Sequence, residues 1–131
     1  SDQSRINLLD DAEVISRKIK KSKTDSFPFP DSLTSLDDRP EVKNLINIYS
    51  SLAEIETEKI FKEYSGKNFS LFKNNLAELT ISHLSKITSK IKELLDDKSY
   101  LKNILALGSE KANDIASVNI KSIKQIVGFC D

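Results

Sequence analysis

Residues 39–53 read RPEVKNLINIYSSLA, and this stretch indicates the class of fold. Its apolar side chains recur every three or four positions, at Val42, Leu45, Ile46, Tyr49, Leu52 and Ala53. Such spacing places them on one face of an α-helix. Pro40 suits the first turn, where its missing N–H leaves no hydrogen bond unmade. We therefore predict a helix that begins at Asp38 or Arg39 and buries one face.

Helical spacing continues on both sides of this stretch. Toward the N-terminus we predict a helix that begins at Asp10 or Asp11, because Asp10 and Glu13 have the pattern of a capping box. Residues 24–38 are expected to form a loop, since they contain two prolines. After residue 56 we expect four more helices, each bounded by a capping residue or a glycine. They run from Thr57 to Gly66, from Ser70 to the break at Asp96-Asp97, from a cap at Asp96 or Asp97 to Gly108, and from Ser109 to Gly128.

These elements predict the architecture. No segment alternates with the period of two that a half-buried strand would show. The expected fold is therefore all-α, a bundle of about five to six helices that forms a single domain over residues 1–131.

Composition excludes several kinds of site. The chain has 20 Lys or Arg and 20 Asp or Glu residues, so its formal net charge is zero and any nucleic-acid contact must come from a local patch. His83 is the one histidine and Cys130 the one cysteine, which excludes an internal disulfide and a zinc site built from such residues. We interpret His83 as a packing or edge residue. No apolar run is long enough to cross a membrane, and we expect no metal site and no complete active site.

One cluster of basic residues invites two interpretations. Five of the seven residues from Arg17 to Lys23 are basic, and Thr24, Asp25 and Ser26 follow directly. The charges favour the negative end of a helix dipole and could simply form a solvated helix end. The alternative is a patch that contacts phosphate or RNA, in which the loop reads unstacked bases.

A second, weaker cluster joins basic and aromatic side chains. It consists of Lys67 and Lys73 with Phe69 and Phe72. Phe69 equally suits a hydrophobic staple before a helix capped at Ser70. The loop at residues 27–31 raises a similar question, because its two phenylalanines could stack on bases or pack on the core.

Five strings in order along the chain resemble one family of enzymes. They are SDQSRINLLDD at 1–11, RKIKKSKTDS at 17–26, RPEVKNLINIYS at 39–50, GKNF at 66–69 with Lys73, and GSEKA at 108–112 followed by VGF at 127–129. Together they resemble the bacterial tryptophanyl-tRNA synthetases, from the residues just after the KMSKS signature onward.

The resemblance implies the C-terminal anticodon-binding domain of a class I tryptophan–tRNA ligase. Residues 1–9 would follow KMSKS and link to a Rossmann catalytic domain that this chain lacks, with Ser1 as the last residue of that signature. The intact enzyme is expected to be a cytoplasmic homodimer, joined through its catalytic domain, that activates tryptophan with ATP and magnesium. The chain alone should hold no cofactor and catalyse nothing.

The resemblance also implies a partner, tRNA(Trp), and a set of contacts. In that family the end of the first helix, the Thr-Asp-Ser loop and the start of the long helix approach the anticodon. With the basic cluster, the candidate tRNA-binding residues are Arg17, Lys20, Lys21, Lys23, Thr24, Asp25, Ser26 and Lys73. Two other functions remain open: the corresponding domain of a tyrosyl-tRNA synthetase, and a helical protein–protein interaction domain without an RNA role.

Overall fold

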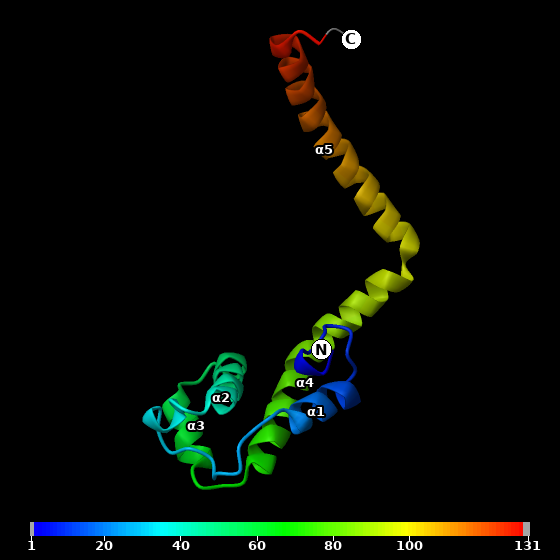
Figure 1. Cartoon of the computed structure of the whole chain (residues 1–131). Helices are drawn as coiled ribbons and strands as arrows, with labels where there is room; N and C mark the ends of the chain where they lie inside the picture. Colours follow the sequence, from blue (N-terminus) through cyan, green and yellow to red (C-terminus); the bar gives the residue numbers. More distant parts are fainter. Residues whose placement is uncertain (1, 130–131) are drawn as a thin grey trace. The chain divides into compact units, whose positions relative to one another are not determined.

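The computed structural model describes residues 2–129 and consists of helices and the turns between them (Figure 1). Its elements are the 3-10 helix η1 (Asp2–Ser4), α1 (Ala12–Lys21), the 3-10 helix η2 (Thr34–Leu36), α2 (Pro40–Ala53), α3 (Thr57–Tyr64), α4 (Phe69–Asp96) and α5 (Lys98–Val127). No described residue belongs to a strand, and the all-helical class is confirmed. Within the same range, no helix is both long enough and apolar enough to cross a membrane.

The chain divides into two compact units, and each is described by itself. The first extends to Lys90 and contains α1, α2, α3 and most of α4, whereas the second begins at Ile91 and contains α5. That the chain forms one domain stays a prediction.

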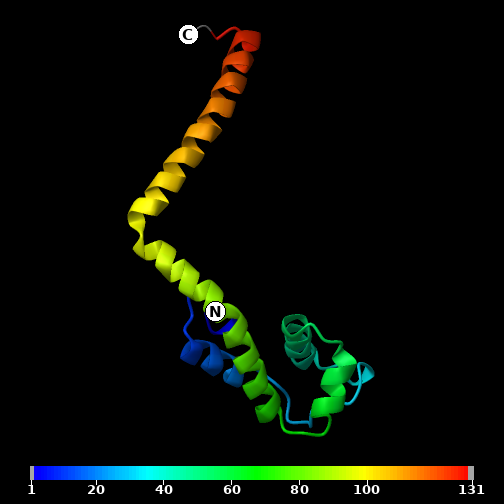
Figure 2. The ribbon, with the colours of Figure 1, turned by 180° about the vertical axis from the view of Figure 1, so that it is seen from behind.

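The first unit is built on a core of buried apolar side chains. Both views show α2 and α3 side by side (Figures 1 and 2), as the end of one helix leads directly into the next. The core is made of Ile15, Ile19, Phe29, Leu36, Val42, Leu45, Ile46, Ile60, Phe61, Tyr64, Phe69, Phe72, Leu76 and Ala77. Aromatic rings join its parts: the centroid of Phe72 lies 4.8 Å from that of Phe29 and 5.3 Å from that of Tyr64. Such pairs add stabilisation beyond the area that they bury.

Two hydrogen-bonded anchors hold the N-terminal segment on this unit. The buried Lys18 Nζ lies 2.7 Å from the Asp10 carboxylate, whose pKa is lowered chiefly by that hydrogen bond. Thr88 of α4 donates its hydroxyl to the carbonyl of Leu8 at 2.7 Å. Residues 2–10 are therefore fixed to both α1 and α4.

Helix starts follow the expected chemistry, although the capping residue sometimes differs. Asp11 rather than Asp10 caps α1, since Asp11 accepts from the N–H of Val14 at 2.8 Å. At α4 the predicted cap Ser70 lies inside the helix, and its N–H donates to the side chain of Asn68 at 2.8 Å. Thr57 is the first residue of α3, and Glu56 takes the cap position.

The second unit corrects one boundary. Asp97 begins α5 by accepting from the N–H of Tyr100 at 2.9 Å, and Gly128 ends it in a left-handed conformation, both as predicted. The predicted break at Gly108 is wrong, because α5 runs through that residue without interruption. A glycine inside a helix costs only about 1 kcal/mol relative to alanine, which a long helix tolerates.

Candidate nucleic-acid interface

The basic end of α1 separates into exposed and buried cations. Lys18 is buried against the carboxylate of Asp10 and is therefore not part of the exposed basic surface. Lys23 is exposed but pairs with Glu41 of α2 at 2.7 Å, a contact that raises the pKa of Lys23. Arg17, Lys20 and Lys21 are exposed, and none of them forms an ion pair with a residue that the structure describes. These last three remain available to a phosphate.

The loop after α1 is held by a guanidinium. Arg39, which precedes α2, donates from Nε to Asp25 Oδ2 at 2.7 Å and from Nη2 to Asp25 Oδ1 at 2.8 Å. The same Nη2 reaches the carbonyl of Pro28 at 3.1 Å. These hydrogen bonds, above all, lower the pKa of the Asp25 carboxyl. A bidentate pair of this kind fixes direction as well as distance.

Lys73 of α4 fixes the same loop from the other side. Its Nζ donates to the carbonyl of Ser22 at 2.7 Å and to the hydroxyl of Thr24 at 3.0 Å. The side chain is buried, and that burial lowers its pKa. Lys73 therefore supports the loop from beneath, whereas Ser26 is exposed and forms no side-chain hydrogen bond with a described residue.

The residues that follow join the loop to the turn before α4. The N–H of Phe29 donates to the carbonyl of Lys67 at 3.2 Å, and the N–H of Gly66 donates to the carbonyl of Phe29 at 3.1 Å. Gly66 adopts φ of 70°, a conformation that glycine reaches without strain. Phe29 packs in the core, whereas Phe27 is 67% exposed, so core packing accounts for only one of the two phenylalanines.

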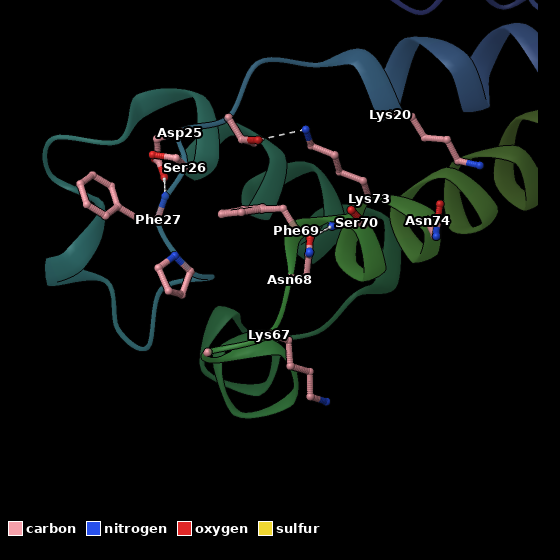
Figure 3. Close-up of a pocket in the computed structure, with 13 residues that line it drawn as sticks. Lys20, Asp25, Ser26, Phe27, Lys67, Asn68, Phe69, Ser70, Lys73 and Asn74 are labelled. Carbon is pink, nitrogen blue, oxygen red and sulfur yellow. Dashed lines mark hydrogen bonds between the residues drawn. The ribbon is translucent and has the colours of Figure 1, made fainter.

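Between the loop and the turn lies a pocket of about 690 Å³. Figure 3 shows Phe27 at one end and Lys20 at the other, with Phe69, Ser70 and Lys73 between them. Its lining residues are Lys20, Thr24, Asp25, Ser26, Phe27, Pro28, Gly66, Lys67, Asn68, Phe69, Ser70, Lys73 and Asn74. The lining contains three lysines, Lys20, Lys67 and Lys73, and one aspartate, Asp25, whose charge is already balanced by Arg39. The pocket is therefore locally positive in a chain of zero net charge.

Five of the predicted site residues meet in this pocket: Lys20, Thr24, Asp25, Ser26 and Lys73. Arg17 and Lys21 lie with Lys20 around an open hollow on the outer face of α1. Lys23 lies apart from both. Ser1 falls outside the described residues. Among residues 2–129, no three His, Cys, Asp or Glu side chains gather as they would around a metal ion.

Comparison with known proteins decides the family resemblance. The tryptophan–tRNA ligase of Rhizobium meliloti (strain 1021) is 43% identical over 129 residues, and that of Rickettsia conorii (strain Malish 7) is 47% identical over 131. This chain is homologous to a region that makes up about a third of the length of tryptophan–tRNA ligases. The match covers 98% of the chain but only 36% and 38% of those two relatives. No protein-family model matches the chain.

The homology to tryptophan–tRNA ligases confirms the resemblance drawn from the five strings. Several pocket residues nevertheless escaped sequence reasoning. Asn68 and Asn74 carry no distinctive local pattern, and the loop sequence does not indicate which of Phe27 and Phe29 is exposed. The contact of Arg39 with the pocket residue Asp25 has no local signal, because the two residues lie 14 positions apart.

Proposed function

We propose that this chain is the tRNA-binding part of a tryptophan–tRNA ligase and that it recognises the anticodon of tRNA(Trp). The observation that supports this function best is the positive pocket between residues 24–28 and 66–70. Unpaired lysines beside hydroxyl and amide groups suit a single-stranded RNA loop, since cations hold phosphates and polar groups read base edges. The homology to tryptophan–tRNA ligases points to the same partner.

The contacts divide into three kinds. Arg17, Lys20 and Lys21 hold the RNA backbone, with a lesser contribution from Lys23 because Glu41 already balances its charge. Ser26 and the free lone pair of the Thr24 hydroxyl meet base edges. Asp25 and Lys73 act mainly by fixing the position of this loop, since their polar atoms already make hydrogen bonds within the chain.

The chemistry of the intact ligase belongs to a part that this chain does not match. There, tryptophan is activated with ATP and magnesium in the cytoplasm and transferred to tRNA(Trp), in a homodimer formed through the catalytic part. Ser1 would be the last residue of the KMSKS signature. The chain by itself binds tRNA and has no activity of its own.

The test is a titration of the chain with an anticodon stem-loop at several salt concentrations. For contacts with single strands, each neutralised phosphate contributes about 0.7 to the slope of log K against log salt. Lys20→Ala and Arg17→Ala should each reduce the slope by about that amount. Lys43→Ala, an exposed lysine of α2 away from the pocket, is the control and should leave it unchanged. A folded chain that binds no stem-loop at low salt would refute the function.

A second function is favoured by a different observation. No residue of α5 is buried, and most of its large apolar side chains are exposed, at Tyr100, Ile104, Leu105, Leu107, Ile115, Val118, Ile120, Ile123, Ile126 and Val127. Exposed apolar surface of this extent is typical of a protein–protein interaction site. If the chain were a helical interaction domain without an RNA role, titration with the anticodon stem-loop would show no binding at any salt concentration. The tyrosyl-tRNA synthetase alternative gains no support from the relatives above, which are tryptophan–tRNA ligases.

A further inference from the structure

Phe27 differs from every other aromatic residue that the structure describes in the first unit. Its side chain is 67% exposed, whereas those of Phe29, Phe61, Tyr64, Phe69 and Phe72 are buried and that of Tyr49 is half-buried. Phe29, only two positions later, enters the core. Core packing therefore gives no reason for a phenylalanine at position 27.

The backbone that carries this ring is held on both sides. The N–H of Phe27 donates to Asp25 Oδ1 at 3.0 Å, and Asp25 is fixed in turn by Arg39. Immediately after Phe27, the carbonyl of Pro28 accepts from Arg39, and Phe29 is anchored in the core. The ring is thus presented from an ordered backbone, which reduces the entropy lost when a ligand binds.

The surroundings of the ring select the kind of ligand. Phe27 stands at one end of the pocket that Lys20 and Lys67 also line (Figure 3). The Arg39 guanidinium lies over the ring of Phe27, with its carbon 5.9 Å from the ring centroid. Proteins that bind single-stranded nucleic acid combine a positive groove with an aromatic ring on which a base stacks. The volume of about 690 Å³ falls in the range that holds one small organic ligand, which includes a nucleotide.

We propose that Phe27 stacks on one unpaired base of the bound RNA loop, while Lys20 and Lys67, which line the same pocket, hold phosphates of that loop. This inference rests on the tRNA-binding function proposed above and adds the group that receives the base. Stacking tolerates every base, so Phe27 contributes affinity, whereas Ser26 and Asn68 at the same pocket contribute selectivity.

The first test compares variants of the chain in binding an anticodon stem-loop. Phe27→Leu should weaken binding by about 5- to 140-fold, which corresponds to the loss of one base–aromatic stack. Phe27→Tyr keeps a ring and should bind like the unaltered chain. Leu33→Ala removes another exposed apolar side chain of the same loop, outside the pocket, and should have no effect. Circular dichroism verifies folding, and Phe27→Met replaces Phe27→Leu if leucine disturbs it.

The second test finds the base. Each unpaired nucleotide of the stem-loop is replaced in turn by an abasic nucleotide, and each RNA is titrated with the unaltered chain and with Phe27→Leu. At one position the two losses should not add, because both changes remove the same stack. If the unaltered chain binds but Phe27→Leu binds equally well, or if the losses add at every position, the stacking proposal is wrong and tRNA binding stands. If the unaltered folded chain does not bind, the proposed function itself fails.

Discussion

Arg39 and Asp25 form a bidentate ion pair, with Nε 2.7 Å from Oδ2 and Nη2 2.8 Å from Oδ1, that fixes the loop between α1 and η2. The Arg39 side chain is 14% exposed and the Asp25 side chain 30% exposed, so solvent screens the pair in part. Arg39 also lies against the rings of Phe27 and Phe69, with centroids at 5.9 and 5.6 Å. Arg39, which lies outside the pocket lining, thus contacts four residues of that lining: Asp25, Phe27, Pro28 and Phe69.

Replacing this arginine should loosen the loop. Arg39→Lys keeps the charge but cannot make the two parallel hydrogen bonds or the flat contact with the rings. We expect the free energy of unfolding to fall by about 1 kcal/mol and stem-loop affinity to fall roughly three- to tenfold. Urea unfolding, amide exchange at residues 25–28 and the stem-loop titration measure these effects. Arg17→Lys, which changes an exposed arginine without an ion pair, is the matched control. Unchanged exchange at residues 25–28 would show that Arg39 does not fix the loop.

Acid should release the same loop. The pKa of Asp25 is lowered by Arg39 in the folded chain, so the folded state binds fewer protons than the unfolded state near the ordinary value of 3.8. The contribution of this carboxylate to stability is therefore complete above that pH and is lost as the pH falls through the lower folded-state pKa. The unfolding free energy of Asp25→Asn should decline less steeply below about pH 4 than that of the unaltered chain. Asp37→Asn is the control, and equal slopes for Asp25→Asn and the unaltered chain would contradict the prediction.

Raising the pH toward 10.5 should increase the stability that Lys73 contributes to the folded chain. Burial lowers the pKa of this lysine, so near its folded-state pKa the unfolded chain binds more protons than the folded chain. Stability therefore rises with pH through the window that ends at the ordinary value of 10.5. The difference in unfolding free energy between the unaltered chain and Lys73→Met should grow over that window, and subtraction removes the titrations that both share. A difference that shrinks would mean that the pKa of Lys73 is raised.

Gly108 offers a test in the second unit. It lies inside α5, and a Cβ placed on it would meet no atom within 4 Å. Gly108→Ala should stabilise the helix by about 1 kcal/mol, visible as increased helical circular dichroism and a higher melting temperature. Gly128→Ala should do the reverse, because Gly128 ends α5 with φ of 79°. Lower helicity in Gly108→Ala would argue for a break at this residue after all.

Local signals explain what could be predicted from the sequence. Pro40, Asp97 and Gly128 mark helix ends through their own backbone chemistry, and the structure places helix ends at all three. The predicted helix end at Gly108 is wrong because the low helix propensity of one glycine is too small to interrupt a helix that continues on both sides. The candidate residues around Thr24 came from a charge cluster and a family resemblance, both readable along the chain.

Contacts between distant residues explain the rest. Lys18 and Lys20 look alike in the sequence, but one is buried against Asp10 and the other lines the pocket. Lys73 was expected to face RNA, and only the folded chain reveals that its ammonium group is occupied by Ser22 and Thr24. Such differences depend on which helix face meets the core, and residue type alone does not determine that.

Recognition of the anticodon by the pocket can be tested by comparing the binding of two RNAs. The dissociation constant of the chain is measured for the tRNA(Trp) anticodon stem-loop and for the same stem-loop with all three anticodon bases changed, at one fixed salt concentration. Loss of base contacts at about 1–3 kcal/mol for each good bidentate pair predicts binding at least roughly tenfold weaker for the changed loop. Ser26→Ala should reduce the difference in affinity between the two stem-loops, whereas Lys43→Ala should leave that difference unchanged. Equal affinity for the two stem-loops would contradict anticodon recognition and leave a surface that holds only RNA backbone.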